Sequence, residues 1–137
     1  MINVLNNVVS GLQAQSTKLA VSASNIANAD SRGSLDPDNI RQPYQALEVE
    51  TVSQSTNAVN GGVRAIVLPK EPGAVVSYDP DSPLANTQGE IGIPNVNIGE
   101  ELINNIQASQ AYKASLQLIP VIKDMDEALF NAVDKNS

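Results

Sequence analysis

Large aliphatic side chains recur at alternating spacings of three and four residues near the start of the chain. This spacing is the a/d pattern of a helix that packs along one seam. The seam consists of Ile2, Leu5, Val9, Leu12, Ser16, Leu19, Ala23 and Ile26. The segment contains no proline, its single charge is Lys18, and Asn28, Asp30 and Gly33 follow as helix-ending residues. The sequence therefore predicts an N-terminal helix within residues 1–30.

The positions off this seam are Asn, Gln, Ser, Thr and Ala, with almost no Lys or Glu. An ordinary amphipathic helix packs one face on its own domain and carries charges on its solvent face. Small uncharged residues on every face are typical of a helix that contacts protein on several sides. The pattern allows both interpretations.

A second seam with the same spacing occupies the last third of the chain. It consists of Ala108, Ala111, Ser115, Leu118, Ile122, Met125, Leu129 and Ala132. Asn97 and Glu100 have the spacing of a capping box at its start. A continuous helix over residues 98–133 would be about 54 Å long. Because Pro120 removes one backbone donor and crowds the carbonyl of Leu116, we expect a kink there or two helices that meet.

The segment between the two predicted helices holds seven of the eight prolines of the chain. It contains four β-like runs, at residues 47–51, 63–68, 74–78 and 90–93. Pro69–Gly73 lies between the second and third runs and has the composition of a hairpin loop. Ser31–Gln42 and Gln54–Gly62 are predicted to be mobile loops.

These patterns predict an α+β fold with three parts. Long N- and C-terminal helices, within residues 1–30 and 97–137, pack as an antiparallel coiled-coil pair. A small β-hairpin-rich middle segment, residues 31–96, connects them.

The middle segment is poor in large apolar residues, so the helices cannot bury their seams on it. Burying one Leu or Ile stabilises by about 1.5–3 kcal/mol, whereas ordering one residue costs about 1–2 kcal/mol of backbone entropy. For a lone chain, the entropy cost of ordering the helices therefore exceeds the free energy gained by burying their seams. We therefore expect terminal helices that are largely unfolded in the free monomer and fold as copies of the chain pack together.

The formal net charge of −7 and the absence of His and Cys exclude several classes of function. Phosphate binding needs clustered cations, so nucleic acid is not an expected partner. Thiolate and imidazole metal sites, Ser-His and Cys-His catalysis and disulfides are excluded. The clusters Asp36–Asn39 and Asp79–Ser82 fail the spacing of an EF-hand loop and fit turns instead. We expect no catalytic residue, no metal and no cofactor.

No apolar run approaches the roughly 18 residues of a membrane span. The first residues lack the basic and continuous apolar stretches of a secretory signal. We expect a protein that is not membrane-inserted and that is exported without a cleaved signal peptide.

Short motifs occur in order over nearly the whole chain. They are Ser24, Asn25, Ile26, Ala27 and Asn28 in the first helix, Gln42, Pro43, Tyr44, Tyr78, Pro80, Pro83, Pro94, Asn95, Val96 and Asn97 in the middle segment and at its end, and Tyr112 in the last helix. The Asn-Ile-Ala-Asn part resembles the signature of the flagellar axial protein family. The Tyr-x-Pro and Pro-Asn-Val-Asn parts resemble its short proximal-rod members. The chain departs from that pattern at Gln110, where relatives often carry Arg, and at Pro120.

The resemblance implies a structural subunit of the bacterial flagellar basal-body rod. That rod is a helical drive shaft across the periplasm, which transmits motor torque to the hook and encloses the export channel. The implied partners are copies of the chain, other flagellar rod proteins, the junction protein at the rod base and the type III export apparatus. The terminal helices would line the inner wall and pack between subunits through their seams.

Three other interpretations remain open. Another rod or axial protein of the same superfamily would share the same architecture. An export chaperone or binding module, which holds a client in the seams, would be stable alone. A carboxylate enzyme would depend on Asp36, Asp79 and Asp81.

Overall fold

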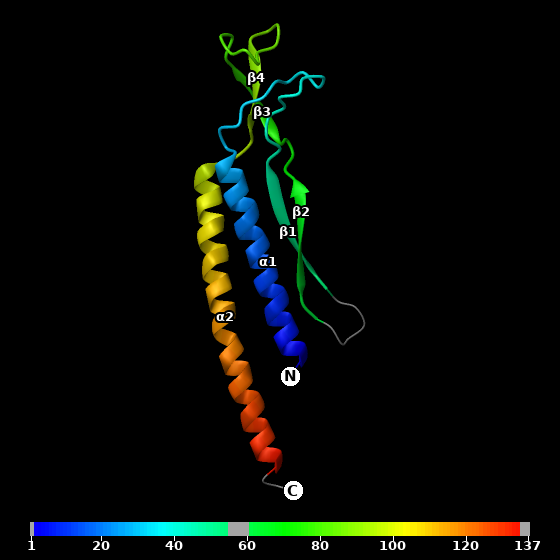
Figure 1. Ribbon diagram of the computed structural model, residues 1–137, viewed down its shortest axis with the longest axis vertical. Helices are drawn as coiled ribbons and strands as arrows, with labels where there is room; N and C mark the ends of the chain where they lie inside the picture. The colour runs from blue at the N-terminus through cyan, green and yellow to red at the C-terminus, as the bar shows by residue number, and fades with distance from the viewer. Residues whose placement is uncertain (1, 55–60, 135–137) are drawn as a thin grey trace.

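The computed structural model describes residues 2–54 and 61–134 of the 137. Two long helices lie side by side and run in opposite directions, with two short antiparallel hairpins between them in the sequence (Figure 1). The elements in chain order are α1 (Ile2–Ala27), β1 (Leu47–Ser53), β2 (Val63–Pro69), β3 (Ala74–Tyr78), β4 (Glu90–Pro94) and α2 (Ile98–Asp134). The α+β class and the two terminal helices predicted from the sequence are confirmed.

Helix α1 ends where its sequence loses the helical pattern. The Asn28 and Ser31 amides donate to the carbonyls of Ser24 and Asn28, at 3.1 and 3.0 Å, and close the last turn. The Asn28 side-chain amide also donates to the Ser24 carbonyl, at 2.8 Å. Local hydrogen bonds therefore satisfy backbone groups that the end of a helix leaves without intrahelical partners.

Helix α2 begins at the cap that the sequence predicts. The Asn97 side-chain oxygen accepts a hydrogen bond from the Glu100 amide at 3.2 Å, and Glu100 and Glu101 lie in the first turn, at the positive end of the helix dipole. One helix continues through Pro120 to Asp134. The alternative of two separate helices meeting at Pro120 is therefore wrong, because the surrounding turns keep helical geometry despite the missing donor.

The strands form two separate two-stranded sheets. β1 pairs with β2 from Leu47 opposite Pro69 to Ser53 opposite Val63, and β3 pairs with β4 from Ala74 opposite Pro94 to Tyr78 opposite Glu90. The predicted hairpin of residues 63–68 with 74–78, joined by Pro69–Gly73, is therefore wrong. Two prolines in that connection lack the amide donors of a ladder, and β2 finds a seven-residue partner in β1 instead.

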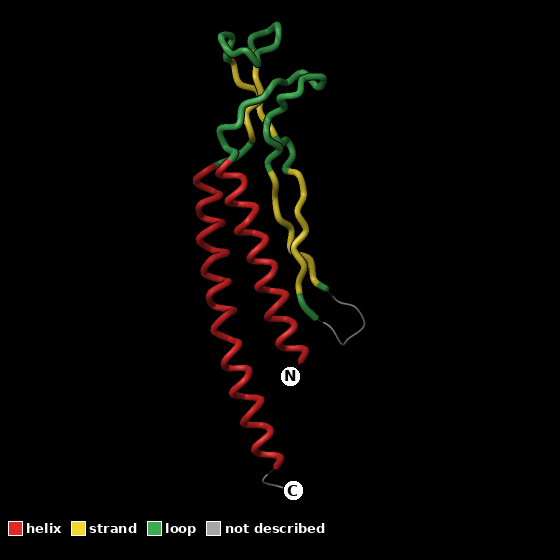
Figure 2. Tube along the Cα trace, viewed as in Figure 1, coloured by secondary structure: helices red, strands yellow, loops and turns green. Residues whose placement is uncertain are grey.

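Pro69–Gly73 instead leads from one hairpin to the other. The Lys70 amide donates to the Ala46 carbonyl at 2.8 Å, and the Gly73 carbonyl accepts from the Ala46 and Asn95 amides at 3.4 and 2.9 Å. These bonds join the ends of the two hairpins. As Figure 2 shows, the β1–β2 hairpin lies along α1, whereas the β3–β4 hairpin extends beyond the end of the helix pair.

The segment that follows α1 is attached to the β3–β4 hairpin by a backbone bridge. Gly33 and Gly92 exchange amide-to-carbonyl bonds of 2.9 and 2.8 Å. A Cβ atom on Gly33 would collide with the backbone of Pro43, so this position requires glycine. The predicted loop over Ser31–Gln42 is held by hydrogen bonds of its own, described below, and most of the predicted loop over Gln54–Gly62 lies outside the described residues.

Candidate functional site

A buried asparagine joins the two helices to the first hairpin. Asn25 is 1% exposed on the last turns of α1. Its Nδ2 donates to the Leu47 carbonyl at 2.7 Å and to Glu101 Oε1 at 2.6 Å. Its Oδ1 accepts from the Leu47 amide at 3.0 Å and from the Tyr44 hydroxyl at 3.1 Å. The side chain therefore uses all of its usual hydrogen-bonding capacity and pairs with both backbone groups of the first residue of β1.

Two serines of α1 extend this cluster. Ser22 Oγ donates to the Glu101 carbonyl at 2.7 Å. Ser24 Oγ lies 3.0 Å from the Tyr44 hydroxyl, and because that hydroxyl donates to Asn25, Ser24 is the donor of this bond. We call Ser22, Ser24, Asn25, Tyr44 and Glu101 the clasp. Across the described residues, every fully buried side-chain nitrogen and oxygen has a hydrogen-bond partner, so the clasp carries no fully buried polar atom without one.

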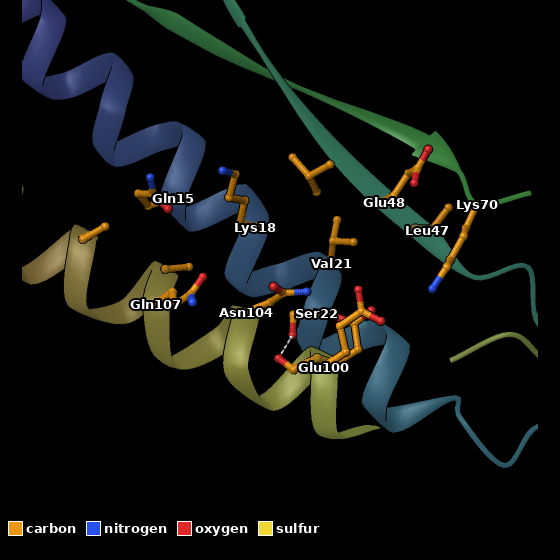
Figure 3. A pocket seen from close by; sticks show the side chains of 14 residues that line it. Gln15, Lys18, Val21, Ser22, Leu47, Glu48, Lys70, Glu100, Asn104 and Gln107 are labelled. Atoms are coloured by element: carbon orange, nitrogen blue, oxygen red, sulfur yellow. Dashed lines mark hydrogen bonds between the residues drawn. The ribbon is translucent and has the colours of Figure 1, made fainter. Parts of the chain in front are cut away.

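An open pocket of about 410 Å³ lies beside the clasp, between α1, α2 and the start of β1 (Figure 3). Lys18 and Lys70 share this pocket with the carboxylates of Glu48, Glu100 and Glu101. Neither lysine is within salt-bridge distance of a carboxylate in the described part of the chain. Hydrogen bonds of the clasp, and not ion pairs of these lysines, therefore connect α1 to α2 and to the start of β1.

The predicted seam of α1 lies away from this buried face. The buried side chains of α1 are Ala14, Val21, Ser22 and Asn25. Two residues along a helix turn about 200° around its axis, so Ser16 and Ala23 of the seam lie opposite Ala14, Val21 and Asn25, and both are exposed. Apart from Val21, the side chains on the inner face of α1 are therefore small or polar. The large aliphatic side chains of the seam lie away from that face.

Five of the remaining seam residues of α1 are exposed or half-buried. Leu5 and Val9 are each 40% exposed, whereas Leu12, Leu19 and Ile26 are half-buried. Ile2 is the first residue of α1.

The predicted seam of α2 divides along its length. Ala108 is buried, and Ala111, Ser115 and Ile122 are half-buried, whereas Leu118, Met125 and Leu129 are exposed. The buried and half-buried side chains of α2 are Glu101, Asn105, Ala108, Ser109, Ala111, Tyr112, Ser115, Ile119 and Ile122. Four of them, Ala108, Ala111, Ser115 and Ile122, belong to the predicted seam. The helices therefore pack along a line that is polar and small near the clasp.

The motif residues of the middle segment occupy turns and ends of elements. Tyr78, Pro80 and Pro83 are exposed around the turn after β3, and Pro94 is buried at the end of β4. Asn95 Nδ2 donates to the Pro72 carbonyl at 2.9 Å, Val96 is half-buried and Asn97 caps α2. In the first helix, Ile26 is half-buried and Ala27 is the last helical residue. The structure brings Ser24, Asn25 and Tyr44 together, but it places the exposed residues of the turn in a different region.

Sequence reasoning missed two members of the clasp, Ser22 and Glu101, and the Leu47 backbone to which Asn25 binds. The available signal was the pair Ser22 and Asn25, which lie off the aliphatic seam of α1. That pair has no obvious partner in the sequence, because Glu101 is 76 residues away from Asn25.

Neither described helix has the length of apolar, weakly charged sequence needed to cross a membrane. Within residues 2–54 and 61–134, no three acidic side chains come together in a way that could hold a metal ion.

Known proteins resemble this chain at both ends and over most of its length. The family model "Flagella basal body rod protein" matches residues 5–33, and the model "Flagellar basal body rod FlgEFG protein C-terminal" matches residues 87–132. The flagellar basal-body rod protein FlgC of Escherichia coli is 37% identical over 127 residues, which are 91% of this chain and 92% of that protein. FlgC of Salmonella typhimurium is 36% identical over the same shares. An axial helix signature with a buried asparagine, a matching C-terminal helix and this extent of identity lead to one conclusion: the chain belongs to the FlgC family of flagellar basal-body rod proteins.

Proposed function

We propose that this chain is a structural subunit of the bacterial flagellar basal-body rod. It assembles with copies of itself and with other rod proteins into a helical shaft across the periplasm. That shaft transmits torque from the motor to the hook and encloses the export channel. The role is mechanical and involves no catalytic step or cofactor.

The observation that carries the proposal is the placement of side chains on α1. Three of its buried side chains, Ala14, Ser22 and Asn25, are small or polar, and the fourth is Val21. Val4, Leu5 and Val9, in contrast, remain exposed. A helix of a self-sufficient domain normally does the opposite and buries its large aliphatics. An apolar face that the chain leaves uncovered is the kind of surface that a protein partner buries.

The far end of α2 supports the same role. α2 has 37 residues and α1 has 26, so α2 is about 17 Å longer at 1.5 Å per residue. Figure 1 shows the end of α2 extending past the start of α1. Met125, Leu129 and Phe130, on this extension, are 60%, 55% and 75% exposed. Helices of neighbouring subunits would cover them.

In the assembled shaft, we infer that the seam residues make coiled-coil contacts, Ala108 within the chain, where it is already buried, and the others between subunits. The seam residues are Ile2, Leu5, Val9, Leu12, Leu19, Ala23, Ile26, Ala108, Ala111, Leu118, Ile122, Met125 and Leu129. Further partners under this proposal are the junction protein at the rod base and the type III export apparatus, which would pass the chain in an unfolded form.

The proposal is tested by deleting the gene and examining basal bodies by electron microscopy. We expect truncated or missing rods and loss of motility, with both restored by a plasmid copy of the native gene. Mass spectrometry of basal bodies purified from the complemented strain should detect the protein. Complete, motile flagella in the deletion strain would contradict the proposal.

A further inference from the structure

The loop between α1 and β1 projects from the end of the helix pair that carries the β3–β4 hairpin (Figure 1). We call residues 34–42 the arm. The Ser34 amide donates to the Arg41 carbonyl at 2.7 Å and closes its base. Inside it, Asp36 Oδ1 accepts from the Asp38 amide at 3.0 Å, and Gln42 Nε2 donates to the carbonyls of Asp36 and Asn39 at 2.6 and 2.8 Å. The arm therefore holds its shape through its own hydrogen bonds.

The arm presents one aliphatic side chain beside one cation. Ile40 is 100% exposed, and the neighbouring Arg41 is exposed without a salt bridge to any described residue. A single exposed aliphatic is common on protein surfaces. Ile40 differs because a closed loop fixes its position, so a contact through it costs little conformational entropy.

A groove lies against the arm, and Ile40 is not among its lining residues. It has a volume of about 420 Å³ and runs between the arm and the turn that joins β3 to β4. Leu35, Pro83, Leu84 and Ala85 provide its apolar lining, and the exposed carboxylate of Asp36 lies at its edge. Asn86 Oδ1 accepts from the Gln88 and Glu90 amides, both at 2.9 Å, and fixes the wall that the turn contributes.

We propose that Ile40 of one copy inserts into this groove on a neighbouring copy, with its Arg41 against the neighbour's Asp36. The apolar knob matches the apolar lining, and the cation beside the knob matches the anion beside the groove. The contact is heterologous, because different patches meet, and such contacts generate rings or helical assemblies. Since knob and groove lie at the same end of the molecule, the joined copies stand side by side. This inference rests on the proposed assembly of copies into a rod.

Cysteine cross-linking tests the contact, because the native chain contains no cysteine. Ile40→Cys and Ala85→Cys are placed on two differently tagged copies and co-expressed in the deletion strain, and basal bodies are purified and mildly oxidised. We expect a disulfide-linked dimer that carries both tags, since a disulfide forms only between Cα atoms about 4.4–6.8 Å apart. Ile40→Cys paired with Thr51→Cys, on the exposed face of β1, is the matched control and should give no such dimer.

A second set of variants measures the contribution of the side chain. Ile40→Asp should weaken incorporation into rods at least about tenfold, because it removes the aliphatic side chain that the contact between copies would bury. Ile40→Leu should retain incorporation. Because Ile40 is fully exposed and takes no part in the bonds of the arm, both variants should fold. Protein in basal bodies without the Ile40–Ala85 cross-link would overturn this contact and leave the proposed function intact. Absence of the native protein from basal bodies of the complemented strain would overturn both.

Discussion

Asn25 is the single side chain on which the relative position of three elements depends. Replacing it with Ala removes four hydrogen bonds and leaves the amide and carbonyl of Leu47 and the Glu101 carboxylate without this partner. Buried polar groups that lose their partners cost about 1–3 kcal/mol each. We expect Asn25→Ala to lower the free energy of unfolding by about 3 kcal/mol, measured by urea denaturation, and to speed amide hydrogen exchange at Leu47.

Asn28→Ala is the matched control for Asn25→Ala. The Asn28 side-chain amide donates only to the Ser24 carbonyl of its own helix end, so its loss should cost about 1 kcal/mol or less. Equal effects of the two substitutions would contradict the role assigned to the clasp.

Gly89 is required by the backbone of the turn between β3 and β4. Its φ of +77° lies in the left-handed region, and a Cβ there would come within 2.9 Å of Tyr78 Cε2 and 3.0 Å of Pro80 Cβ. We expect Gly89→Ala to destabilise by at least about 1–2 kcal/mol, seen as a lower urea midpoint. Gly11→Ala, in the middle of α1 with open space around its Cβ, should instead stabilise by about 0.5–1 kcal/mol. The same sign for both variants would contradict this account.

At the scale of the elements, Pro120 weakens α2 without ending it. Pro120→Ala restores the missing amide donor and removes the clash of the ring with the preceding turn. We expect this substitution to stabilise the helix by up to about 3 kcal/mol. The circular dichroism signal at 222 nm should then be lost at a higher midpoint temperature. An unchanged or lower midpoint would indicate that the surroundings of Pro120 have adapted to the ring.

The extension of α2 should be dispensable for the single chain and required in the assembly. Leu129→Asp places a charge on a side chain that is 55% exposed in the single chain, so the free energy of unfolding should change by about 1 kcal/mol or less. Assembly into rods should weaken at least about tenfold, measured by the amount of protein in purified basal bodies.

Asn131→Asp is the control for Leu129→Asp. It adds the same charge to the same turn of α2, but about 200° away around the helix axis. Asn131→Asp should leave assembly close to the native level. A comparable defect in both variants would show that charge alone, and not the loss of an aliphatic contact, disturbs assembly.

At the scale of the whole molecule, the apolar faces that remain exposed make the free chain marginal. The ordering of about 60 helical residues is opposed by backbone entropy, and many of the aliphatics that would offset it are uncovered. We expect low helicity in dilute protein and an increase with concentration, measured by circular dichroism across a dilution series. The urea and thermal measurements predicted above are therefore made at the concentrated end of that series, where the chain is helical. A dilute monomer that is fully helical and melts cooperatively would contradict this prediction.

Much of the fold could be predicted because its signals are local. The heptad spacing and the Asn97 cap locate both helices to within a few residues, and the β-like runs locate all four strands. The clasp could be predicted only in part. Ser24, Asn25 and Tyr44 stand in recognisable motifs, whereas Glu101 and Ser22 acquire their roles through contacts between residues far apart in the sequence.

Which segments become helix or strand follows from local sequence alone, because helical and strand periodicity, capping and proline placement act over a few neighbouring residues. Local sequence also shows that the large aliphatics on the two helices exceed what the middle segment can cover. Which strands pair and which face of α1 turns inward is known only from the fold in three dimensions. Those choices depend on long-range partners: β1 offers β2 a longer ladder than β3 does, and the buried amide of Asn25 must satisfy Leu47 and Glu101. That requirement turns Ser22 and Asn25 of α1 inward and leaves much of its aliphatic seam exposed.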